Sequence, residues 1–245
     1  MQPELNIGPL ELKTFGLCFA LGFVAAGLLA ARRFGELDLS VDWAYELIFA
    51  GLAGGFVGAR VDYLIQNWDS ASDDLLGAAF SGSGLVWLGG VVGGAIAVLA
   101  WGRWRGFFGL ALLDFCAPLI AVGYTIGRVG CQLSGDGDYG QASDLPWAMA
   151  YPEGTEPTTT EVHPTPIYES LAMGLIAFAL WRLRGRLRPG LVFALWLVLS
   201  GLERLLVEFV RRNETVALGL TQPQIVSVAM LAVGAAWLLR ARQPA

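Results

Sequence analysis

Seven long apolar runs divide the chain and constrain its fold more than any other feature. An α-helix needs about 17 to 25 mostly apolar residues to cross the hydrocarbon core of a bilayer. Each run falls within this range, and the seven are Leu12–Ala31, Asp42–Ile65, Gly84–Gly102, Phe107–Gly127, Pro166–Arg182, Gly190–Val210 and Gln222–Leu239. We therefore predict an all-α integral membrane protein with seven transmembrane helices.

Little of the chain is left for a soluble domain, because 55% of its 245 residues are hydrophobic. We predict a single seven-helix domain over residues 1–245, in which residues 129–165 form a small head between the fourth and fifth helices. The first residues carry neither a basic region nor a small-residue cleavage site before the first apolar run. We therefore expect this end of the chain to be retained and not removed as a signal peptide.

The composition also argues against several classes of partner. A net charge of −5 gives no indication of nucleic-acid binding. Cys18 and Cys116 fall within predicted helices, Cys131 falls at the start of the head segment, and the chain has one histidine. This pattern matches no disulfide framework or metal-ligand spacing, so we expect neither a metal nor another cofactor.

The basic residues predict how the helices are oriented. Arginines gather in alternate connections, whereas the connection after the second helix is acidic. The four basic clusters are Arg32 with Arg33, Arg103 with Arg105, Arg182 with Arg184, Arg186 and Arg188, and Arg240 with Arg242. By the positive-inside rule these clusters face the cytoplasm. The N-terminus and the head are then outside, in the periplasm, and the C-terminus is cytoplasmic; Arg211 and Arg212 are exceptions.

Three further arginines lie inside or at the edge of apolar runs, where an arginine costs at least about 2.5–3.5 kcal/mol. They are Arg60, Arg128 and Arg204, and the predicted orientation places all three at the depth of the outer leaflet. One interpretation is structural: each arginine pairs with a nearby carboxylate or extends its side chain to the membrane interface. The candidate carboxylates are Asp62, Asp136, Glu203 and Glu208. The other is a pocket for an anionic lipid headgroup, since guanidinium binds phosphate through paired hydrogen bonds.

Two other motifs fall at the same depth, and each has a structural interpretation and a functional one. Gly89 and Gly90 either permit close helix packing or admit a lipid headgroup to the backbone. His163, in the motif HPTPIYE, either belongs to a simple helix entry or transfers protons near neutral pH.

The sixth apolar run carries charges at helical spacing. Arg204 and Glu208 are four residues apart, and Glu208 and Arg211 are three apart, so a continuous helix places all three on one face. We predict that they pair, and that the pairing orients the guanidinium of Arg204. For Asp114 in the fourth helix we expect only a buried hydrogen bond.

Together these motifs resemble the bacterial prolipoprotein diacylglyceryl transferases over nearly the whole chain. The matching segments occur in order along the sequence, and they are GARVDY, GLVWLGGVVGG, GRVGCQLSGD followed by DLPW, HPTPIYE and ERLLVEFVRR. The resemblance implies a multi-pass enzyme of the bacterial inner membrane with its N-terminus outside. It also implies that the enzyme moves a diacylglyceryl group from phosphatidylglycerol to the lipobox cysteine thiol of a preprolipoprotein and releases glycerol phosphate.

The resemblance also implies roles for individual residues. Arg128 matches the family's arginine at the phosphatidylglycerol site, and Arg204 matches its essential arginine in the sixth helix. Other motif positions are expected to line the lipid site; they are Arg60, Tyr63, Gly89, Gly90, Glu208 and Arg211.

The chain departs from the family pattern at several positions. Leu88 stands where the third-helix motif commonly has histidine, and Asp136 stands where the family usually has glutamate. Asparagine and phenylalanine of the family's GRxxNF element are replaced by Cys131 and Gln132, and the first-helix tyrosine by Phe15. The phosphate-binding side is thus retained, whereas the polar groups near the attacking thiol differ.

A thiolate is the competent nucleophile, so a group must accept the thiol proton. With leucine at position 88, the candidates are His163, Asp136 or a water between them. Two other functions stay open. One is an acyltransferase that uses Cys131 and His163 as a nucleophile and base. The other is a paralogue that binds anionic lipid or a lipoprotein without transferring anything.

Overall fold

The protein is predominantly helical in a computed structural model that describes residues 1–8, 10–71, 77 and 86–241. Within this part of the chain, seven helices have 18 or more residues. They are α1 (Thr14–Glu36), α2 (Trp43–Gln66), α5 (Trp87–Arg105), α6 (Leu110–Ser134), α7 (Thr165–Leu183), α8 (Leu191–Glu208) and α9 (Gln222–Ala241). By length and composition, α1, α2, α6 and α9 are apolar enough to cross a membrane.

All seven predicted helical segments are present, and the differences lie at their ends. Helix α1 extends beyond the apolar run because Arg32 and Arg33 both pair with Glu36 in its last turns. Helix α6 begins after Gly109, whose φ of +86° breaks the helix. The predicted start of the third helix at Gly84 and most of the acidic connection before it lie outside the described residues.

The end of α6 corrects the sequence analysis in a way that affects function. We expected the helix to end near Gly127, with Cys131 in a loop. The helix continues to Ser134 and ends at Gly135, which has a φ of +59°. Arg128 and Cys131 are therefore one helical turn apart on the same helix.

Short strands accompany the helices and were not predicted. Among the described residues they form three two-stranded antiparallel sheets. The strands are β1 (Glu4–Ile7) with β2 (Leu10–Lys13), β3 (Met149–Tyr151) with β4 (Thr158–Val162), and β5 (Thr215–Ala217) with β6 (Leu220–Thr221). A short helix α3 (Trp68–Ala71) follows α2. The predicted head segment, residues 129–165, thus contains the end of α6 and the β3–β4 pair.

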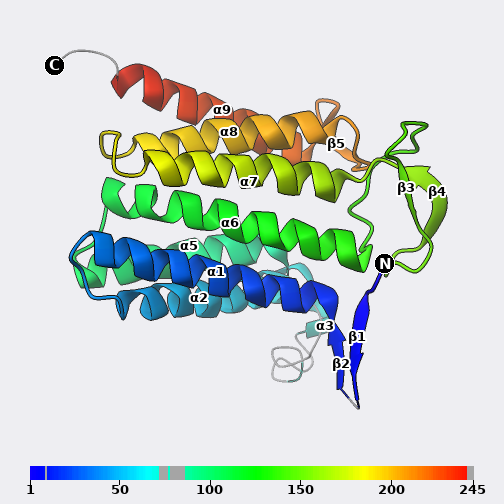
Figure 1. Ribbon diagram of the computed structural model, residues 1–245, viewed down its shortest axis with the longest axis horizontal. Coiled ribbons are helices and arrows are strands. Elements are labelled where there is room, and N and C mark those ends of the chain that lie inside the picture. Colours follow the sequence, from blue (N-terminus) through cyan, green and yellow to red (C-terminus); the bar gives the residue numbers. More distant parts are fainter. Residues whose placement is uncertain (9, 72–76, 78–85, 242–245) are drawn as a thin grey trace. The chain divides into compact units, whose positions relative to one another are not determined.

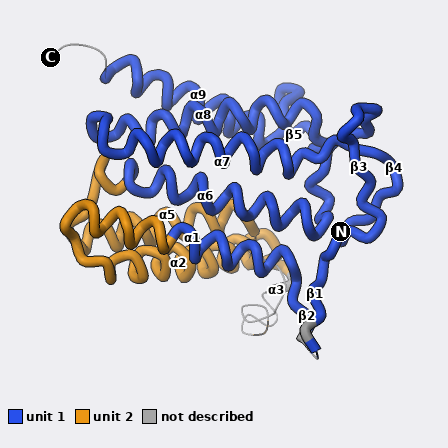
Figure 2. The backbone as a smooth tube through the Cα atoms, in the orientation of Figure 1, with its two compact units in different colours: residues 1–26, 113–245 blue, residues 27–112 orange. Residues whose placement is uncertain are grey.

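The described chain divides into two compact units, which Figure 2 colours separately: unit 1 is residues 1–26 with 113–245, and unit 2 is residues 27–112. In unit 1, α7 packs against α8 and α8 against α9. The C-terminal end of α6, the N-terminal end of α7 and the C-terminal end of α8 all lie toward β3 and β4 (Figure 1). Small side chains on α6 and α7, including Ala117, Ala121 and Ala177, are fully or almost fully buried between these helices.

Asp114 has a defined structural role in unit 1. Its Oδ2 accepts a hydrogen bond from the backbone N–H of Gly190 at 2.6 Å, and its Oδ1 accepts one from Phe193 at 2.8 Å. The first N–H groups of a helix have no partner within the helix. Asp114 on α6 therefore caps the start of α8, which is more specific than the single buried hydrogen bond that we expected.

In unit 2, α2 and α5 pack closely through glycines. A Cβ atom on Gly58 would fall on the backbone of Gly89 and Gly93, and a Cβ on Gly54 would lie 2.6 Å from the carbonyl oxygen of Gly93. A Cβ on Gly90 would lie 3.4 Å from the carbonyl oxygen of Gly55. Both Gly89 and Gly90 thus lie at the α2–α5 interface, as the packing interpretation predicted.

Candidate functional site

The centre of the candidate site is Glu169, which is completely buried just beyond the first turn of α7. Its Oε1 accepts hydrogen bonds from Arg204 Nη1 at 2.6 Å and from the Tyr124 hydroxyl at 2.8 Å. Its Oε2 lies 3.1 Å from Arg211 Nη1 and 3.3 Å from Arg128 Nε. One carboxylate therefore holds three guanidinium groups that come from α6, α8 and the turn after α8.

Asp138 supplies a second carboxylate from the loop after α6. It pairs with Arg128 Nη1 through one oxygen and with Arg211 Nη2 through the other. Its backbone carbonyl accepts a hydrogen bond from the Thr165 hydroxyl, which fixes the loop to the start of α7. Burial acts to raise the pKa of Asp138, but the two guanidinium groups outweigh burial and hold this pKa below its ordinary value.

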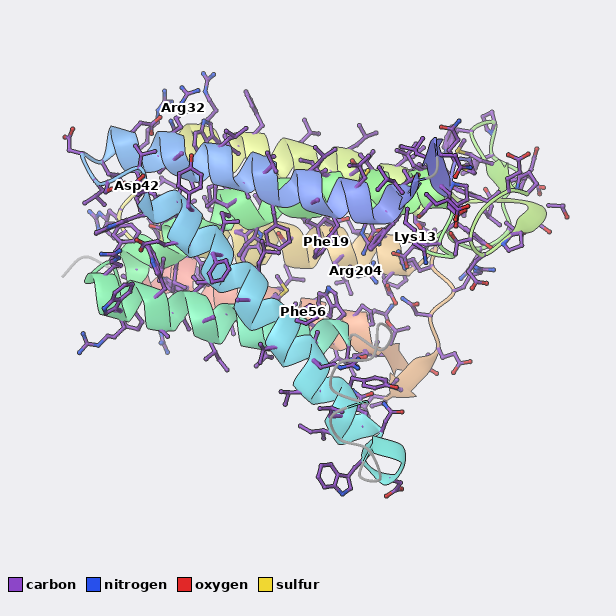
Figure 3. The ribbon with its side chains drawn as sticks, turned by 90° about the horizontal axis from the view of Figure 1, so that it is seen from below. Lys13, Phe19, Arg32, Asp42, Phe56 and Arg204 are labelled. Carbon is purple, nitrogen blue, oxygen red and sulfur yellow. The ribbon has the colours of Figure 1, made fainter. Side chains whose placement is uncertain are left out.

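Glu208 is the third carboxylate of the network. Its Oε2 lies 2.9 Å from Arg204 Nη2, which confirms the predicted pairing at i, i+4. Its Oε1 accepts hydrogen bonds from the side chains of Asn213 and Thr221, each at 2.7 Å. Arg204 is thus held between Glu169 on one side and Glu208 on the other. Figure 3 shows it in the half of α8 that lies nearer to β3 and β4.

The predicted pairing of Glu208 with Arg211 was wrong. It assumed a helix that continued to Val210, whereas α8 ends at Glu208 and the chain turns before Arg211. The turn directs the guanidinium of Arg211 to Asp138 and Glu169 instead. Arg211 is 8% exposed, so it belongs to the buried network and not to the outer surface.

The arginine network, defined as Arg128, Arg204 and Arg211 with Glu169, Asp138 and Glu208, has three positive and three negative groups. The sequence analysis missed Glu169 and Asp138 as partners. No local pattern indicates these two partners, because Glu169 meets Arg204 across 35 positions and Asp138 meets Arg211 across 73 positions of the chain. Charged hydrogen bonds in a buried setting hold the guanidinium groups in fixed orientations, where they can receive an anion without reorganising.

A polar cleft adjoins the network. Its volume is about 340 Å³, and its lining residues are Gly137, Asp138, Tyr139, Arg211, Arg212 and Asn213. Arg212 is exposed at this cleft, where its guanidinium lies 4.4 Å from the centre of the Tyr139 ring. The cleft therefore gives a small polar ligand access to Asp138 and Arg211 of the network.

Of the two candidate bases, Asp136 lies beside Cys131, whereas His163 lies in different surroundings. Cys131 Sγ is 3.8 Å from Arg128 Nη1 and 3.6 Å from Asp138 Oδ2. Ligand atoms of Cys131, Asp136 and Asp138 all lie within 4.8 Å of one another. By contrast, His163 Nδ1 faces the hydroxyl of Tyr168 at 3.4 Å. The structure thus groups Cys131 with acidic residues and Arg128, and it does not support a Cys131–His163 pair.

Arg60, Tyr63, Gly89 and Gly90 belong to unit 2, and the arginine network belongs to unit 1. Arg60 is 6% exposed, and its guanidinium lies 5.0 Å from the centre of the Tyr63 ring. Arg60 is thus a buried residue of α2. A role for these four residues at a lipid site stays a prediction.

The sequence of this chain is similar to a known protein family over almost its full length. The model of the family described as prolipoprotein diacylglyceryl transferase matches residues 3–240. The chain belongs to this family. The resemblance that the short motifs indicated is therefore confirmed over almost the full length, and the chain is a transferase of the family that acts in lipoprotein maturation.

Several relatives carry the name phosphatidylglycerol–prolipoprotein diacylglyceryl transferase. The protein from Mannheimia succiniciproducens is 33% identical, and the alignment covers 96% of this chain and 91% of that protein. The protein from Aeromonas hydrophila subsp. hydrophila is 36% identical, with 94% and 86% covered. The protein from Clostridium tetani is 31% identical, with 86% of each chain covered.

Proposed function

We propose that this chain transfers the diacylglyceryl group of phosphatidylglycerol to the lipobox cysteine thiol of preprolipoproteins. The names of its relatives supply the substrates, and the arginine network is the observation that carries the proposal. Its three guanidinium groups are held in fixed positions by buried carboxylates. Such an arrangement suits a phosphodiester that gains negative charge as its ester bond breaks.

The proposal includes seven crossings of the bacterial inner membrane. Helices α5, α7 and α8 have 19, 19 and 18 residues, which is enough to cross a bilayer beside α1, α2, α6 and α9. In unit 1, the basic ends of α7 and α9 lie opposite to the β3–β4 pair (Figure 1). This arrangement supports a cytoplasmic basic end, a periplasmic N-terminus and a periplasmic head.

In the proposed mechanism, Arg128 and Arg204 bind the lipid phosphodiester, and Arg211 orients them through Glu169. The cysteine sulfur of the preprolipoprotein attacks the glyceryl carbon next to the phosphate. A carbon–sulfur bond forms, the carbon–oxygen bond breaks, and the electron pair leaves on the glycerol phosphate. The thiol proton passes to a nearby base, for which Asp136 and His163 are the candidates. Asp138 is a poor base because the pKa of its carboxyl is held low.

The test uses purified protein in vesicles that contain phosphatidylglycerol, with a lipobox peptide as acceptor. We expect the wild type to form the thioether-linked product, and Arg128→Ala and Arg204→Ala to lower the rate at least about 100-fold. Normal transfer by Arg128→Ala would exclude the assignment of the phosphate site. Complementation of a strain depleted of its own diacylglyceryl transferase provides an independent check.

A second candidate function rests on Leu88, which stands on α5 where the resemblance predicts histidine. Loss of that polar group favours a paralogue that binds anionic lipid without transfer. The same assay separates the two functions, because such a protein binds phosphatidylglycerol vesicles through Arg128 but forms no product.

A further inference from the structure

Glu203 is a buried carboxyl that the proposed mechanism does not use. It precedes Arg204 on α8, and the residue is 9% exposed. Among the described residues, neither carboxyl oxygen has a hydrogen-bond partner. Burial of a carboxyl without hydrogen bonds is costly, and buried polar groups in folded proteins almost always have partners. An unpartnered pair of oxygen atoms at this position therefore indicates a missing ligand.

The surroundings of Glu203 place that ligand beside the phosphate site. Its carboxyl interacts electrostatically with Glu169, Arg204, Arg128 and Arg211. These arginines already form ion pairs with other carboxylates, so Glu203 is not needed as their counter-ion. A ligand of Glu203 must instead offer hydrogen-bond donors close to a group bound by Arg128 and Arg204.

The headgroup of phosphatidylglycerol meets this requirement. It carries two adjacent hydroxyl groups a few bonds from the phosphodiester, and two hydroxyls match the two oxygens of a carboxyl. An ionised carboxyl accepts a hydrogen bond from each hydroxyl, one at each oxygen, whereas an amide in its place offers only one acceptor oxygen. We propose that Glu203 binds the glycerol hydroxyls of the lipid headgroup and selects phosphatidylglycerol among lipids with the same phosphodiester charge.

This inference rests on the proposed function, since it assigns a headgroup contact at the same site. It also predicts a specific kind of selectivity. A site built to hydrogen-bond a hydroxyl rejects an analogue without that hydroxyl strongly, because its own polar group is then left unpaired. Removal of the carboxyl should therefore weaken selection between headgroups and leave the chemical step at the phosphate largely intact.

The test compares two lipids in otherwise identical vesicles, phosphatidylglycerol and phosphatidyl-1-propanol. Both have a three-carbon headgroup and one negative charge, but the second lacks both hydroxyls. The variants are Glu203→Leu, which removes the carboxyl at similar size, and Glu203→Gln, whose amide still accepts and donates. The control is Ser227→Ala, because Ser227 Oγ on the neighbouring helix α9 is also buried without a partner among the described residues. Transfer to the lipobox peptide is measured with each lipid, and thermal unfolding in detergent checks the fold.

We expect the wild type to prefer phosphatidylglycerol by about 100-fold or more, and Glu203→Leu to reduce the preference to within about threefold. The rate with phosphatidyl-1-propanol should stay near that of the wild type. The preference of Glu203→Gln for phosphatidylglycerol should lie between those of the wild type and Glu203→Leu, at least about fivefold below the wild-type value. Ser227→Ala should have the wild-type preference.

Two results overturn the inference: a wild type that uses both lipids equally, or a Glu203→Leu variant that loses the same factor with both. If Glu203→Leu does not fold, Glu203→Gln decides, and an unchanged preference in that variant also overturns the inference. A wild type that transfers from neither lipid overturns the proposed function instead.

Discussion

Arg204 and Glu169 are 35 positions apart in the chain, and their side chains meet at 2.6 Å. Glu169 also contacts Arg128 and Arg211, so it joins charged groups from α6, α7 and the end of α8 at one point. This one carboxylate thus sets the orientation of every arginine in the network.

Replacement of Glu169 by glutamine should both destabilise the protein and reduce transfer. Removal of one charge from a buried ion pair costs about 3–5 kcal/mol, because the remaining charges are left uncompensated. Thermal unfolding in detergent and the vesicle transfer assay measure the two effects. The matched control is Glu36→Gln, whose partners Arg32 and Arg33 lie at an exposed helix end, where we expect a change below about 1 kcal/mol. Equal stability losses in the two variants would contradict the proposed importance of burial.

Asp138 should make the protein sensitive to acid. Its pKa in the folded protein lies below the ordinary value of about 4 for an unfolded chain. The stabilisation by its ion pairs is therefore fully present above the unfolded pKa and is lost as the pH falls through the folded pKa. Unfolding temperatures of the wild type and Asp138→Asn, measured from pH 7 down to pH 3, should converge toward low pH. A constant difference across this range would show that Asp138 acts through packing and not through charge.

Asp114→Ala should remove the cap of α8 without touching the arginine network. Loss of a helix cap costs about 0.5–2 kcal/mol, and here two backbone N–H groups lose their acceptor. We expect lower stability in detergent, with transfer per folded molecule close to that of the wild type. Asp114→Asn keeps one acceptor oxygen, so its stability should lie between those of the wild type and Asp114→Ala.

The α2–α5 interface should not tolerate a larger residue at Gly58. A Cβ there would collide with the backbone of α5, which cannot move aside as a flexible side chain can. We expect Gly58→Ala to destabilise the protein by about 1–3 kcal/mol. Gly16→Ala on α1 is the control, since a Cβ there meets nothing within 4 Å and alanine favours a helix. Improved stability of Gly58→Ala would show that the two helices do not pack as described.

The two candidate bases should differ in their effect on transfer. Asp136 lies in the acidic group around Cys131, next to Arg128, whereas His163 faces Tyr168. We therefore expect Asp136→Asn to lower kcat by about 100-fold and His163→Ala to have a smaller effect. Rates of both variants across pH 5–9 provide the measurement. A wild-type rate for Asp136→Asn at every pH, together with a loss in His163→Ala, would assign the base to His163.

The fold could be predicted from the sequence where a single segment determines its own structure. The apolar runs predicted all seven long helices, because burial of an apolar face or crossing of a bilayer requires such runs. Helix ends were less predictable: α6 continues through Gly127 and Gly130 and ends only at Gly135, whose positive φ breaks the helix. The strands were missed because each has five residues or fewer, which is too short for a strand pattern to be distinguished.

In the candidate site, too, the residues with a local signal were predicted and those that depend on distant partners were not. Arg128 and Arg204 were identified because an arginine in an apolar run is costly wherever the rest of the chain lies. Glu169 was not identified, because its three arginine partners are distant in sequence. The i, i+4 pair of Arg204 with Glu208 was correct, since both residues lie on one continuous helix. The prediction that Arg211 lies on the same helix was wrong, because α8 ends between Glu208 and Arg211.

The distribution of the arginine network along the chain has a consequence for biosynthesis. A ribosome releases Arg128 before Glu169, and Glu169 before Arg204 and Glu208. On the proposed topology, α6 thus enters the membrane with a guanidinium whose nearest early partner is Asp138, ten residues later. Until α7 arrives, Arg128 has only half of its final partners, so a nascent chain that stops after α6 exposes an incompletely neutralised charge to lipid. Asp138, close behind α6, therefore supplies the first opposite charge for Arg128 before α7 is synthesised.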